Sequence, residues 1–547
     1  MRHAVAAVGW SSSTEHVLSD VERDRERHLH DIDAEVGEIV SRDSGGEVPS
    51  PRTRPFFVRY PLGAMRRVAA SPLGPFARKV MRRIERERWR VGHRLARPRS
   101  TDRELLGIEV AALPADAVAG NALLESARTS HIALLRPGSE LTGSGLRAIR
   151  RALDQEPGIE LLFGDSRLPH GVRYRAPAFS PIRLREEDTL GPVVVVAVDA
   201  LRARGGFRPH ADDAHALDIA LRATPSAVRR LREVIGVGRP IERPIGAEAE
   251  AAAAVVRAHL EELGIAATVT TDAGYRWVEY PVVGEPLVSI LIPTRGSSGE
   301  VAGTNRTFVV EAVRDIRDRT TWRNVEIVVV ADDATPQSVI DELVEVAGDR
   351  LVLVRWSESF NFSAKMNRGA AVARGDYLLM LNDDVDVVTP DWIERMLGLA
   401  QQHGIGMVGA MLYFEDGAVQ HLGHLYQGGG AGHVAFGVTP GALAPIAALA
   451  VTREVSGVTA ACALLPADVV EEVGGFSPLF PGNYNDVDLS LKVRSSGRTI
   501  VCTGAARLYH FESRTREATV LPSEFAALAR RWKSMIQHDE YSRELER

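Results

Sequence analysis

Three carboxylates follow directly after a short apolar segment. Residues 377–381, Tyr-Leu-Leu-Met-Leu, are typical of a buried strand, and Asp383, Asp384 and Asp386 come after it. Open α/β sheets bind ligands at the carboxyl ends of their strands. Carboxylates crowded at such an edge repel one another unless a cation lies among them, and hard oxygen ligands suit Mg²⁺ or Mn²⁺. A solvated acidic loop is the alternative interpretation of this segment alone.

Two earlier segments repeat this arrangement of an apolar strand followed by polar side chains. Residues 288–292 and 326–330 are each typical of a buried strand. Helical segments alternate with these strands, which predicts an α/β domain with a mostly parallel, doubly wound sheet. Asp332 could bind a ligand or simply cap the helix after it. The candidates at these strand ends are Pro293, Thr294, Arg295, Asp332, Asn382 and Asp383.

Nine short motifs follow one another from about Pro286 to Arg516. They read V-S-I-L-I-P-T-R, E-I-V-V-V-A-D-D-A-T, F-N-F-S-A-K-M-N-R-G, L-N-D-D-V-D-V, Q-H-L-G, G-G-G-A-G-H, E-E-V-G-G-F, Y-N-D-V-D-L and L-Y-H-F-E-S. This order resembles glycosyltransferase family 2, and most of all its bacterial branch of rhamnosyl and galactofuranosyl transferases for surface polysaccharide. The resemblance implies a GT-A fold, a nucleotide-diphosphate sugar donor, a divalent cation and inversion at the sugar carbon.

The resemblance also implies a role for individual residues. Asp384 and His510 would hold Mn²⁺ or Mg²⁺, and Asp486 would be the base that takes the proton of the acceptor hydroxyl, a poor nucleophile without such help. The segment from Asn382 to Asp384 stands at the family's D-x-D motif and departs from it by beginning with Asn. The residues implied for the nucleotide-sugar are Pro293, Thr294, Arg295, Asp332, Asn382 and Asp383, and those that could support the metal or contact the acceptor are Asp386, Asn485 and His421.

Several charged or histidine side chains have more than one interpretation. Lys365 and Arg368 could contact the diphosphate, but the favoured interpretation places them on a solvated helix face. Three histidines resemble a zinc cluster by composition, whereas the family context indicates a glycine-rich loop on the acceptor side. These histidines are His421, His424 and His433.

The region before this domain repeats part of it. Residues 131–141, H-I-A-L-L-R-P-G-S-E-L, align with 377–387, and G-G-F occurs after both. The copy lacks any counterpart of 288–330. We therefore predict a degenerate GT-A-like domain over 101–265, a linker over 266–285, and a catalytic domain over 286–547 with a C-terminal helix. In the copy, Gly138, Ala216 and approximately Val237 stand at the positions of Asp384, Asp486 and His510.

The composition restricts the cellular setting. The net charge of −6 does not indicate a nucleic-acid partner, and Cys462 and Cys502 are the only cysteines, which suits a reducing compartment. The first residues lack the pattern of a signal peptide, and no apolar run is long enough to span a bilayer. A cytoplasmic protein is therefore expected, with peripheral contact at the inner face of the cell membrane left open.

The first 100 residues are expected to be a polar and basic extension that is partly helical. Residues 51–100 contain fifteen Arg or Lys and two Glu. An amphipathic helix here could lie on anionic lipid, or pack on its own protein with the arginines solvated, which is the favoured interpretation.

Taken together, the motifs predict a metal-dependent inverting glycosyltransferase. Its partners would be a dTDP- or UDP-sugar donor and a cell-surface glycan or lipid-linked acceptor. One alternative is a non-catalytic scaffold for glycan assembly, which the presence of Asp384, Asp486 and His510 disfavours. Another is a metal-dependent nucleotidyltransferase, which would need a Gly-rich phosphate loop near the first strand, and residues 296–299 are only a faint version of one.

Overall fold

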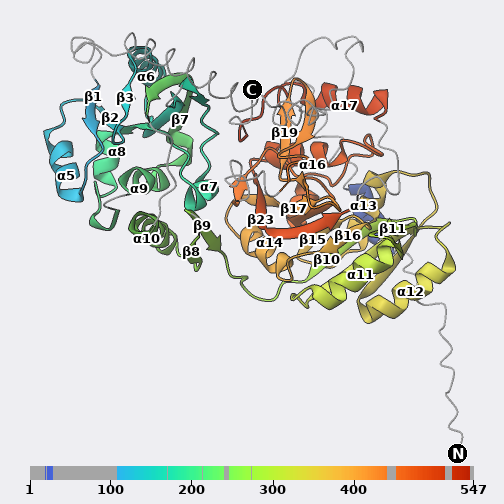
Figure 1. Ribbon diagram of the computed structural model, residues 1–547. Coiled ribbons are helices and arrows are strands. Elements are labelled where there is room, and N and C mark those ends of the chain that lie inside the picture. Colours follow the sequence, from blue (N-terminus) through green and yellow to red (C-terminus); the bar gives the residue numbers. More distant parts are fainter. Residues whose placement is uncertain are drawn as a thin grey trace, which may run out of the picture. The chain divides into compact units, whose positions relative to one another are not determined.

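The computed structural model describes residues 19, 21–28, 108–168, 171–211, 214–238, 246–272, 274–439, 451–511 and 520–542. They belong to two compact units, each described here by itself (Figure 1). Of the described residues, unit 1 contains 19, 21–28 and those from Pro281 to Asp539, and unit 2 contains those from 108 to Tyr280 together with 540–542. The predicted basic segment 51–100 lies outside the described residues.

Unit 1 is built on a ten-stranded sheet with helices packed against it. The strands of this sheet are β10 (Val288–Thr294), β13 (Val325–Asp332), β14 (Leu351–Trp356), β15 (Tyr377–Leu381), β16 (Val385–Val387), β17 (Ile405–Tyr413), β18 (Val419–His421), β21 (Arg453–Glu454), β22 (Cys462–Pro466) and β23 (Thr499–His510). Two hairpins are formed by β11 (Ser298–Val301) with β12 (Thr304–Thr307) and by β19 (His424–Gln427) with β20 (Gly430–His433). The helices are α11 (Phe308–Arg319), α12 (Gln337–Ala347), η4 (Gly348–Arg350), α13 (Phe362–Val372), α14 (Trp392–Ala400), α15 (Ala467–Glu472), α16 (Asn485–Ser495) and α17 (Pro522–Trp532).

The main path of this sheet runs β14-β13-β10-β15-β22-β17-β23-β16. The strands from β14 to β15 are parallel, and antiparallel pairing begins where β22 joins β15. Strands β10 and β13 are almost continuously apolar and buried, as expected for parallel strands whose two faces are covered. The α/β prediction is therefore confirmed, and the carboxyl ends of β10, β13 and β15 meet at one edge.

Unit 2 has its own seven-stranded sheet. Its strands are β1 (Glu109–Ala112), β2 (His131–Leu135), β3 (Glu140–Leu141), β4 (Leu161–Arg167), β5 (Arg173–Tyr174), β6 (Val193–Ala197) and β7 (Val228–Val237), beside a hairpin of β8 (Thr268–Asp272) and β9 (Tyr275–Glu279). Its helices are α5 (Ala117–Ser126), α6 (Gly143–Gln155), α7 (Pro181–Glu186), α8 (Val198–Ala203), η2 (Pro209–Ala211), α9 (His215–Arg222), η3 (Pro225–Ala227) and α10 (Ala247–Glu262).

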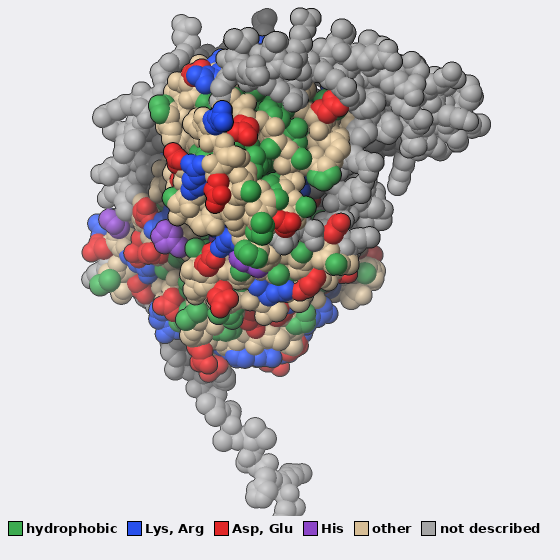
Figure 2. All heavy atoms as spheres, turned by 90° about the vertical axis from the view of Figure 1, so that its left-hand side faces the viewer, with side chains coloured by type: hydrophobic (Ala, Val, Ile, Leu, Met, Phe, Trp, Pro, Cys, Tyr) green, Lys and Arg blue, Asp and Glu red, His purple; other side chains and the backbone are tan. Residues whose placement is uncertain are grey.

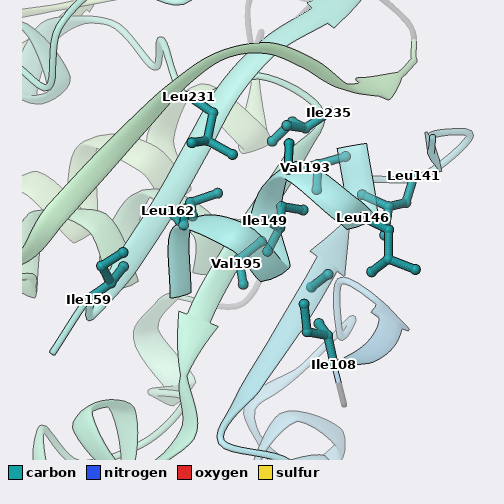
Figure 3. Packing of buried hydrophobic residues seen from close by; sticks show 13 residues of the cluster. Ile108, Leu141, Leu146, Ile149, Ile159, Leu162, Val193, Val195, Leu231 and Ile235 are labelled. Atoms are coloured by element: carbon teal, nitrogen blue, oxygen red, sulfur yellow. The ribbon is translucent and has the colours of Figure 1, made fainter. Parts of the chain in front are cut away.

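The core of unit 2 lies between helix α6 and the sheet. Leu146 and Ile149 are three residues apart on one face of α6 and are fully buried. Figure 3 shows them with Leu162 of β4, Val195 of β6 and Leu231 of β7 in one apolar cluster. Unit 2 therefore has a hydrophobic core of its own.

The sheet of unit 2 has the same strand order as part of unit 1. Its order β1-β2-β6-β4-β7-β3 corresponds strand for strand to β10-β15-β22-β17-β23-β16. The successive pairings are parallel, antiparallel, antiparallel, parallel and antiparallel in both units. Strand β1 occupies the place of β10, so the prediction that 288–330 has no counterpart is wrong for that strand. In the described part of unit 2, no strand corresponds to β13 or β14.

Strand register also corrects one of the predicted equivalences. Leu141 pairs with Gly236, and its equivalent Val387 pairs with Leu508. Counting two residues onward places Gly238, and not Val237, at the position of the family histidine. The equivalent positions are thus Gly138 and Asp384, Ala216 and Asp486, and Gly238 and His510.

One buried hydrogen-bonded contact occurs in both units. The amide of Asn121 on α5 donates to the carbonyl oxygen of Phe207 at 2.9 Å and accepts from the Phe207 N–H at 3.0 Å. Asn367 on α13 makes the same two bonds to Phe476, each at 2.8 Å. Each amide satisfies both backbone groups of a residue after a glycine pair, where regular secondary structure supplies no partner.

The segment predicted to be a linker is largely ordered as a hairpin. Residues 268–279 form the antiparallel strands β8 and β9, and β9 packs on α7. Arg276 is buried there and donates to the carbonyl oxygens of Leu184 and Arg185, both at 2.9 Å. The boundary between the two units falls at Tyr280 and Pro281 because the hairpin belongs to unit 2.

A helix at residues 21–28 contacts unit 1 beside α13 (Figure 1, blue). Arg25 pairs with Glu471 at 2.7 Å and donates to the carbonyl oxygen of Ala373 at 3.0 Å. Glu26 accepts from Arg368 of α13 at 2.7 Å. This helix lies within the segment 1–100, which was predicted to be partly helical.

Two surface properties bear on partners. Among the described residues, no helix combines the length and the apolar character that crossing a membrane requires. On the face drawn in Figure 2, acidic and basic side chains are interspersed among the described residues. That pattern agrees with the small net charge of −6.

Candidate active site

The predicted strand-end residues are connected by hydrogen bonds at one edge of the unit 1 sheet. The Thr294 hydroxyl, at the end of β10, donates to Asp383 Oδ2 at 2.6 Å. Lys365 of α13 donates to Asp332 Oδ1 at 2.7 Å and to the carbonyl oxygen of Thr294 at 2.9 Å. The ends of three parallel strands are therefore joined through Lys365 and Thr294, as the topology of an open sheet allows.

Lys365 is a site residue that sequence reasoning misjudged. Its side chain is 3% exposed, so the interpretation of a solvated helix face is wrong for it. Burial lowers the pKa of Lys365, and the neighbouring Asp332 opposes that effect. Arg368, one turn further along α13, lies over the ring of Trp356 and pairs with Glu26 and Glu358. The motif placed Lys365 on a helix but gave no sign that this helix packs on β10 and β13.

Lys365→Met should destabilise unit 1 and weaken nucleotide binding. The change leaves Asp332 without its cation and removes a donor to Thr294, which costs about 1–3 kcal/mol of unfolding free energy. Urea unfolding and calorimetric titration with UDP and Mn²⁺ measure the two effects. Arg323→Met is the matched control because Arg323 donates to the carbonyl oxygen of Arg317 at the exposed surface, away from the strand ends. Unchanged unfolding and unchanged UDP affinity would contradict the assigned role of Lys365.

Asp384 and His510 are brought together by the pairing of β16 with β23. His510 Nε2 lies 3.1 Å from Asp384 Oδ1 and 2.9 Å from Asn382 Nδ2. On its other side, His510 Nδ1 bonds Gln420 Oε1 at 2.7 Å, which fixes the ring. Both Asp384 and His510 are buried, with 6% and 8% of their side chains exposed. The two residues predicted as metal ligands thus share one site with Asn382.

The charges at this edge suit an added cation. Burial and the adjacent charge of Asp384 raise the pKa of Asp383 to about 7. Burial would also raise the pKa of Asp384, but His510 holds it below the ordinary value. The neighbouring carboxylates of Asp383 and Asp384 therefore have too little positive charge around them for both to be ionised readily. A hard divalent cation commonly takes one or two carboxylates and completes its shell with water and substrate phosphates.

The described residues offer few protein ligands for such a cation. Among them, no group of three or more His, Cys, Asp or Glu side chains is arranged to hold a metal ion by itself. Substrate phosphates and water would complete the shell of a cation held by Asp384 and His510. Of the three histidines, His421 and His433 bond one another through their Nδ1 atoms at 2.7 Å.

Asp386, predicted to support the metal or contact the acceptor, is paired with an arginine. Both of its carboxylate oxygens accept from Arg306 of β12, each at 2.7 Å. Arg306 also lies over the ring of Phe511, the residue after His510. The β11–β12 hairpin is therefore attached to β16, which begins directly after Asp384, and to the residue that follows His510. No sequence pattern connected Arg306 with these strands.

Asp486 lies in the first turn of α16, a helix that carries neither Asp384 nor His510. Its Oδ2 is 3.7 Å from His424 Nε2, and its side chain is 19% exposed. Burial alone would raise the pKa of Asp486, but hydrogen bonds and charge from His424, His433 and Thr459 lower it to about 2. The carboxylate is therefore ionised at neutral pH and can accept a proton.

A short loop connects this carboxylate with the strand-end network. Thr459 bonds the Asp486 side chain, and Ala461, two residues later, accepts from the backbone N–H of Asn382 at 3.1 Å. Asn485 is buried and donates to the carbonyl oxygen of Gly482 at 3.3 Å, and thus helps to fix the start of α16. Pro293 lies in β10 directly before Thr294.

A family model matches part of this region, and two curated proteins are similar to most of the chain. Residues 289–474 match the family model described as glycosyl transferase family 2. The chain is 31% identical over 412 residues to the O-antigen biosynthesis protein RfbC of Myxococcus xanthus, an alignment that covers 72% of this chain and 32% of that protein. It is 30% identical over 450 residues to the uncharacterized protein y4gI of Sinorhizobium fredii, covering 76% of this chain and 48% of that protein. The chain spans less than half the length of both relatives.

Two solved structures also align with the chain. The crystal structure of GalNAc-T7 with UDP, GalNAc and Mn²⁺ gives a TM-score of 0.35 at 13% identity, covering 50% of this chain and 55% of that chain. The mannosyltransferase PcManGT from Pyrobaculum calidifontis, in complex with GDP-Man and Mn²⁺, gives 0.33 at 15% identity, covering 46% of this chain and 71% of that chain.

Proposed function

We propose that this chain, whose residues 289–474 match the glycosyl transferase family 2 model, is a metal-dependent inverting glycosyltransferase of the GT-A fold. It would transfer a sugar from a dTDP- or UDP-sugar to a cell-surface glycan or its lipid-linked precursor. The observation that carries the proposal is the bonded series at the sheet edge. It runs from Asp332 through Lys365, Thr294 and Asp383 to the neighbouring pair of Asp384 and His510.

The parallel half of the sheet would bind the nucleotide. Asp332 and Thr294 present a carboxylate and a hydroxyl at the strand ends, and Lys365 places a positive charge between them. Asp384 and His510 would hold a divalent cation, which supplies positive charge to the leaving diphosphate when bound. Asn382 keeps His510 oriented through its amide. The two carboxylates Asp384 and Asp486 would thus serve separate purposes.

The transfer itself would be a single displacement. The acceptor oxygen forms a bond to the sugar carbon as the bond from that carbon to the diphosphate oxygen breaks, and the nucleoside diphosphate leaves with the bonding electrons. Asp486 receives the proton that the acceptor hydroxyl loses. Its low pKa keeps it ionised before the reaction.

The acceptor class is supported by a relative. The M. xanthus protein is described as an O-antigen biosynthesis protein, and O-antigen is a surface polysaccharide. A glycan or lipid-linked acceptor is accordingly proposed for this chain. The nucleotidyltransferase alternative is disfavoured because residues 298–301 form strand β11 of a hairpin where that alternative needs a phosphate loop.

A screen of dTDP- and UDP-sugars for donor hydrolysis tests the proposal. Turnover should require Mn²⁺ or Mg²⁺, disappear in EDTA and return when the metal is restored, because the diphosphate charge needs a counter-ion at Asp384 and His510. Full activity in EDTA would remove the metal from the proposal. Absence of turnover with every sugar nucleotide, combined with tight glycan binding, would favour the scaffold alternative.

A further inference from the structure

The β19–β20 hairpin places several polar side chains beside Asp486. His424 is the first residue of β19, and it pairs with His433, the last residue of β20. Tyr426 follows on the same strand, and its side chain is fully buried in a cluster with Val487 of α16. The hairpin is therefore packed against the helix that carries Asp486.

His424 connects the buried tyrosine with the carboxylate. Its Nδ1 lies 3.3 Å from the Tyr426 hydroxyl, and its Nε2 lies 3.7 Å from Asp486 Oδ2. Burial raises the pKa of Tyr426 well above its ordinary value, so its hydroxyl keeps its proton. A tyrosine that donates to Nδ1 leaves a neutral histidine with its proton on Nε2, on the side of Asp486.

A glycine leaves the space that this arrangement needs. A Cβ atom on Gly457 would lie 2.6 Å from both His424 Nδ1 and the Tyr426 hydroxyl oxygen. The carbonyl oxygen of Gly457 also accepts from the His424 backbone N–H at 2.7 Å. The loop thus holds His424 from the backbone and leaves its side chain free to meet Tyr426.

The neighbouring histidines have their own bonds. His421 Nε2 accepts from the backbone N–H groups of Gly423 and Thr459, both at 3.2 Å, so a neutral His421 carries its proton on Nδ1. That proton points at His433 Nδ1, 2.7 Å away. Burial lowers the pKa of His421 well below its ordinary value and that of His433 to about 4. Both are therefore neutral at pH 7, and neither competes with Tyr426 for His424 Nδ1.

We propose that His424 is a positioning residue for the base Asp486, held by Tyr426 in the tautomer that carries its proton on Nε2. The inference rests on the proposed function, in which Asp486 is the base. His424 Nε2–H directs the Asp486 carboxylate and stabilises its charge, and the proton from the acceptor stays on Asp486. His424 itself gains and loses no proton in the step.

The surroundings of the pair allow a pH test. Asp486 is faced by His424 from β19, by His433 from β20 and by the Thr459 hydroxyl. Around Tyr426 the charged groups are Arg494 and Asp488 of α16 and Asp539. Protonation of Asp486 slows transfer at low pH and gives the acid limb of the pH profile. In the native chain this limb lies far below pH 5 because the pKa of Asp486 is about 2. His424→Leu removes the neighbour that lowers the pKa of Asp486 most and leaves burial to raise it, so this limb should move to higher pH.

The experiment compares His424→Leu with His424→Gln, which keeps an N–H donor and does not titrate. The pH dependence of kcat/KM is measured from pH 5 to 8 with the sugar nucleotide that turns over in the screen. Below its new limb, His424→Leu should lose about tenfold in rate per pH unit, because one protonated carboxylate blocks the reaction. His424→Gln should follow the native profile. The exposed His403→Gln is the matched control.

The proposal would be overturned if the pH profile of His424→Leu matched the native profile. Equal pH shifts in His424→Leu and His424→Gln would also overturn it. If His424→Leu fails to fold, Tyr426→Phe takes its place. This variant removes only one hydroxyl group and still alters the tautomer of His424. Nitrogen-15 NMR of histidine-labelled full-length chain, with His424→Gln to identify the signal, reads that tautomer without any substrate. Protonated Nε2 is expected in the native chain, and protonated Nδ1 would overturn the inference. If no sugar nucleotide turns over, the proposed function fails while the NMR result still decides the position of the His424 proton.

Discussion

Asp486→Asn should slow sugar transfer by about 10²–10⁴-fold, the usual contribution of a general base. The amide keeps the shape of the carboxylate but cannot take the proton of the acceptor hydroxyl. Binding of UDP with Mn²⁺ should remain near the native affinity because Lys365, Thr294 and Asp384 are untouched. The measurement is single-turnover transfer together with calorimetric titration.

Asp468→Asn is the matched control for this variant. Asp468 is an exposed acid in the first turn of α15, and its carboxylate accepts only the adjacent Val469 N–H among the bonds that the structure gives it. It should transfer sugar at the native rate. Native transfer by Asp486→Asn would mean that another group is the base, and a loss of UDP binding would place Asp486 on the donor side.

Asp384→Ala should abolish turnover and weaken the joint binding of UDP and Mn²⁺ by about 100-fold or more. Groups that only support a metal ligand typically contribute 10–100-fold in metal affinity, so a direct ligand should contribute at least as much. The variant also removes one partner of His510, which keeps its bonds to Asn382 and Gln420. Calorimetry with and without Mn²⁺ separates the effect on the metal from the effect on the nucleotide.

Asp333→Ala provides the control, since Asp333 is exposed at the end of β13, next to Asp332. It should bind UDP and Mn²⁺ as the native chain does. If Asp384→Ala bound both ligands with native affinity, the metal site would have to lie elsewhere. A lower urea midpoint without a change in affinity would assign Asp384 a purely structural role.

The sequence predicts β10, β13 and β15 because each is a short apolar run that ends in turn-forming or polar residues. The strands β17, β22 and β23 were not predicted. The motif at 131–141 predicts that unit 2 resembles unit 1, but the counterpart of β10 in unit 2 was missed. Positions at strand ends, such as Thr294 and Asp383, meet in space because parallel strands of one sheet end at a common edge. Their hydrogen bond is a consequence of that topology.

Contacts made by long side chains across the fold could not be predicted in this way. Arg306 reaches Asp386 from a hairpin about eighty residues earlier, and no periodicity records such a pairing. Lys365 is buried only because α13 packs over β10 and β13. The relation of His424 to Asp486 likewise depends on the packing of the β19–β20 hairpin against α16. The residue types identify candidate site residues, but only the packing of the fold determines which of their side chains come into contact.

The two units share one strand order, so each can be compared with the other position by position. Features present in both belong to the scaffold, such as the amide contacts of Asn121 and Asn367. The buried Asp218 and Asp488 belong there too, since each pairs with a cation four residues later in its helix. The two units differ at the positions of Gly138, Ala216 and Gly238, where unit 1 has Asp384, Asp486 and His510. Under the proposed function, comparison of the two units distinguishes the residues that maintain this architecture from those that act in catalysis.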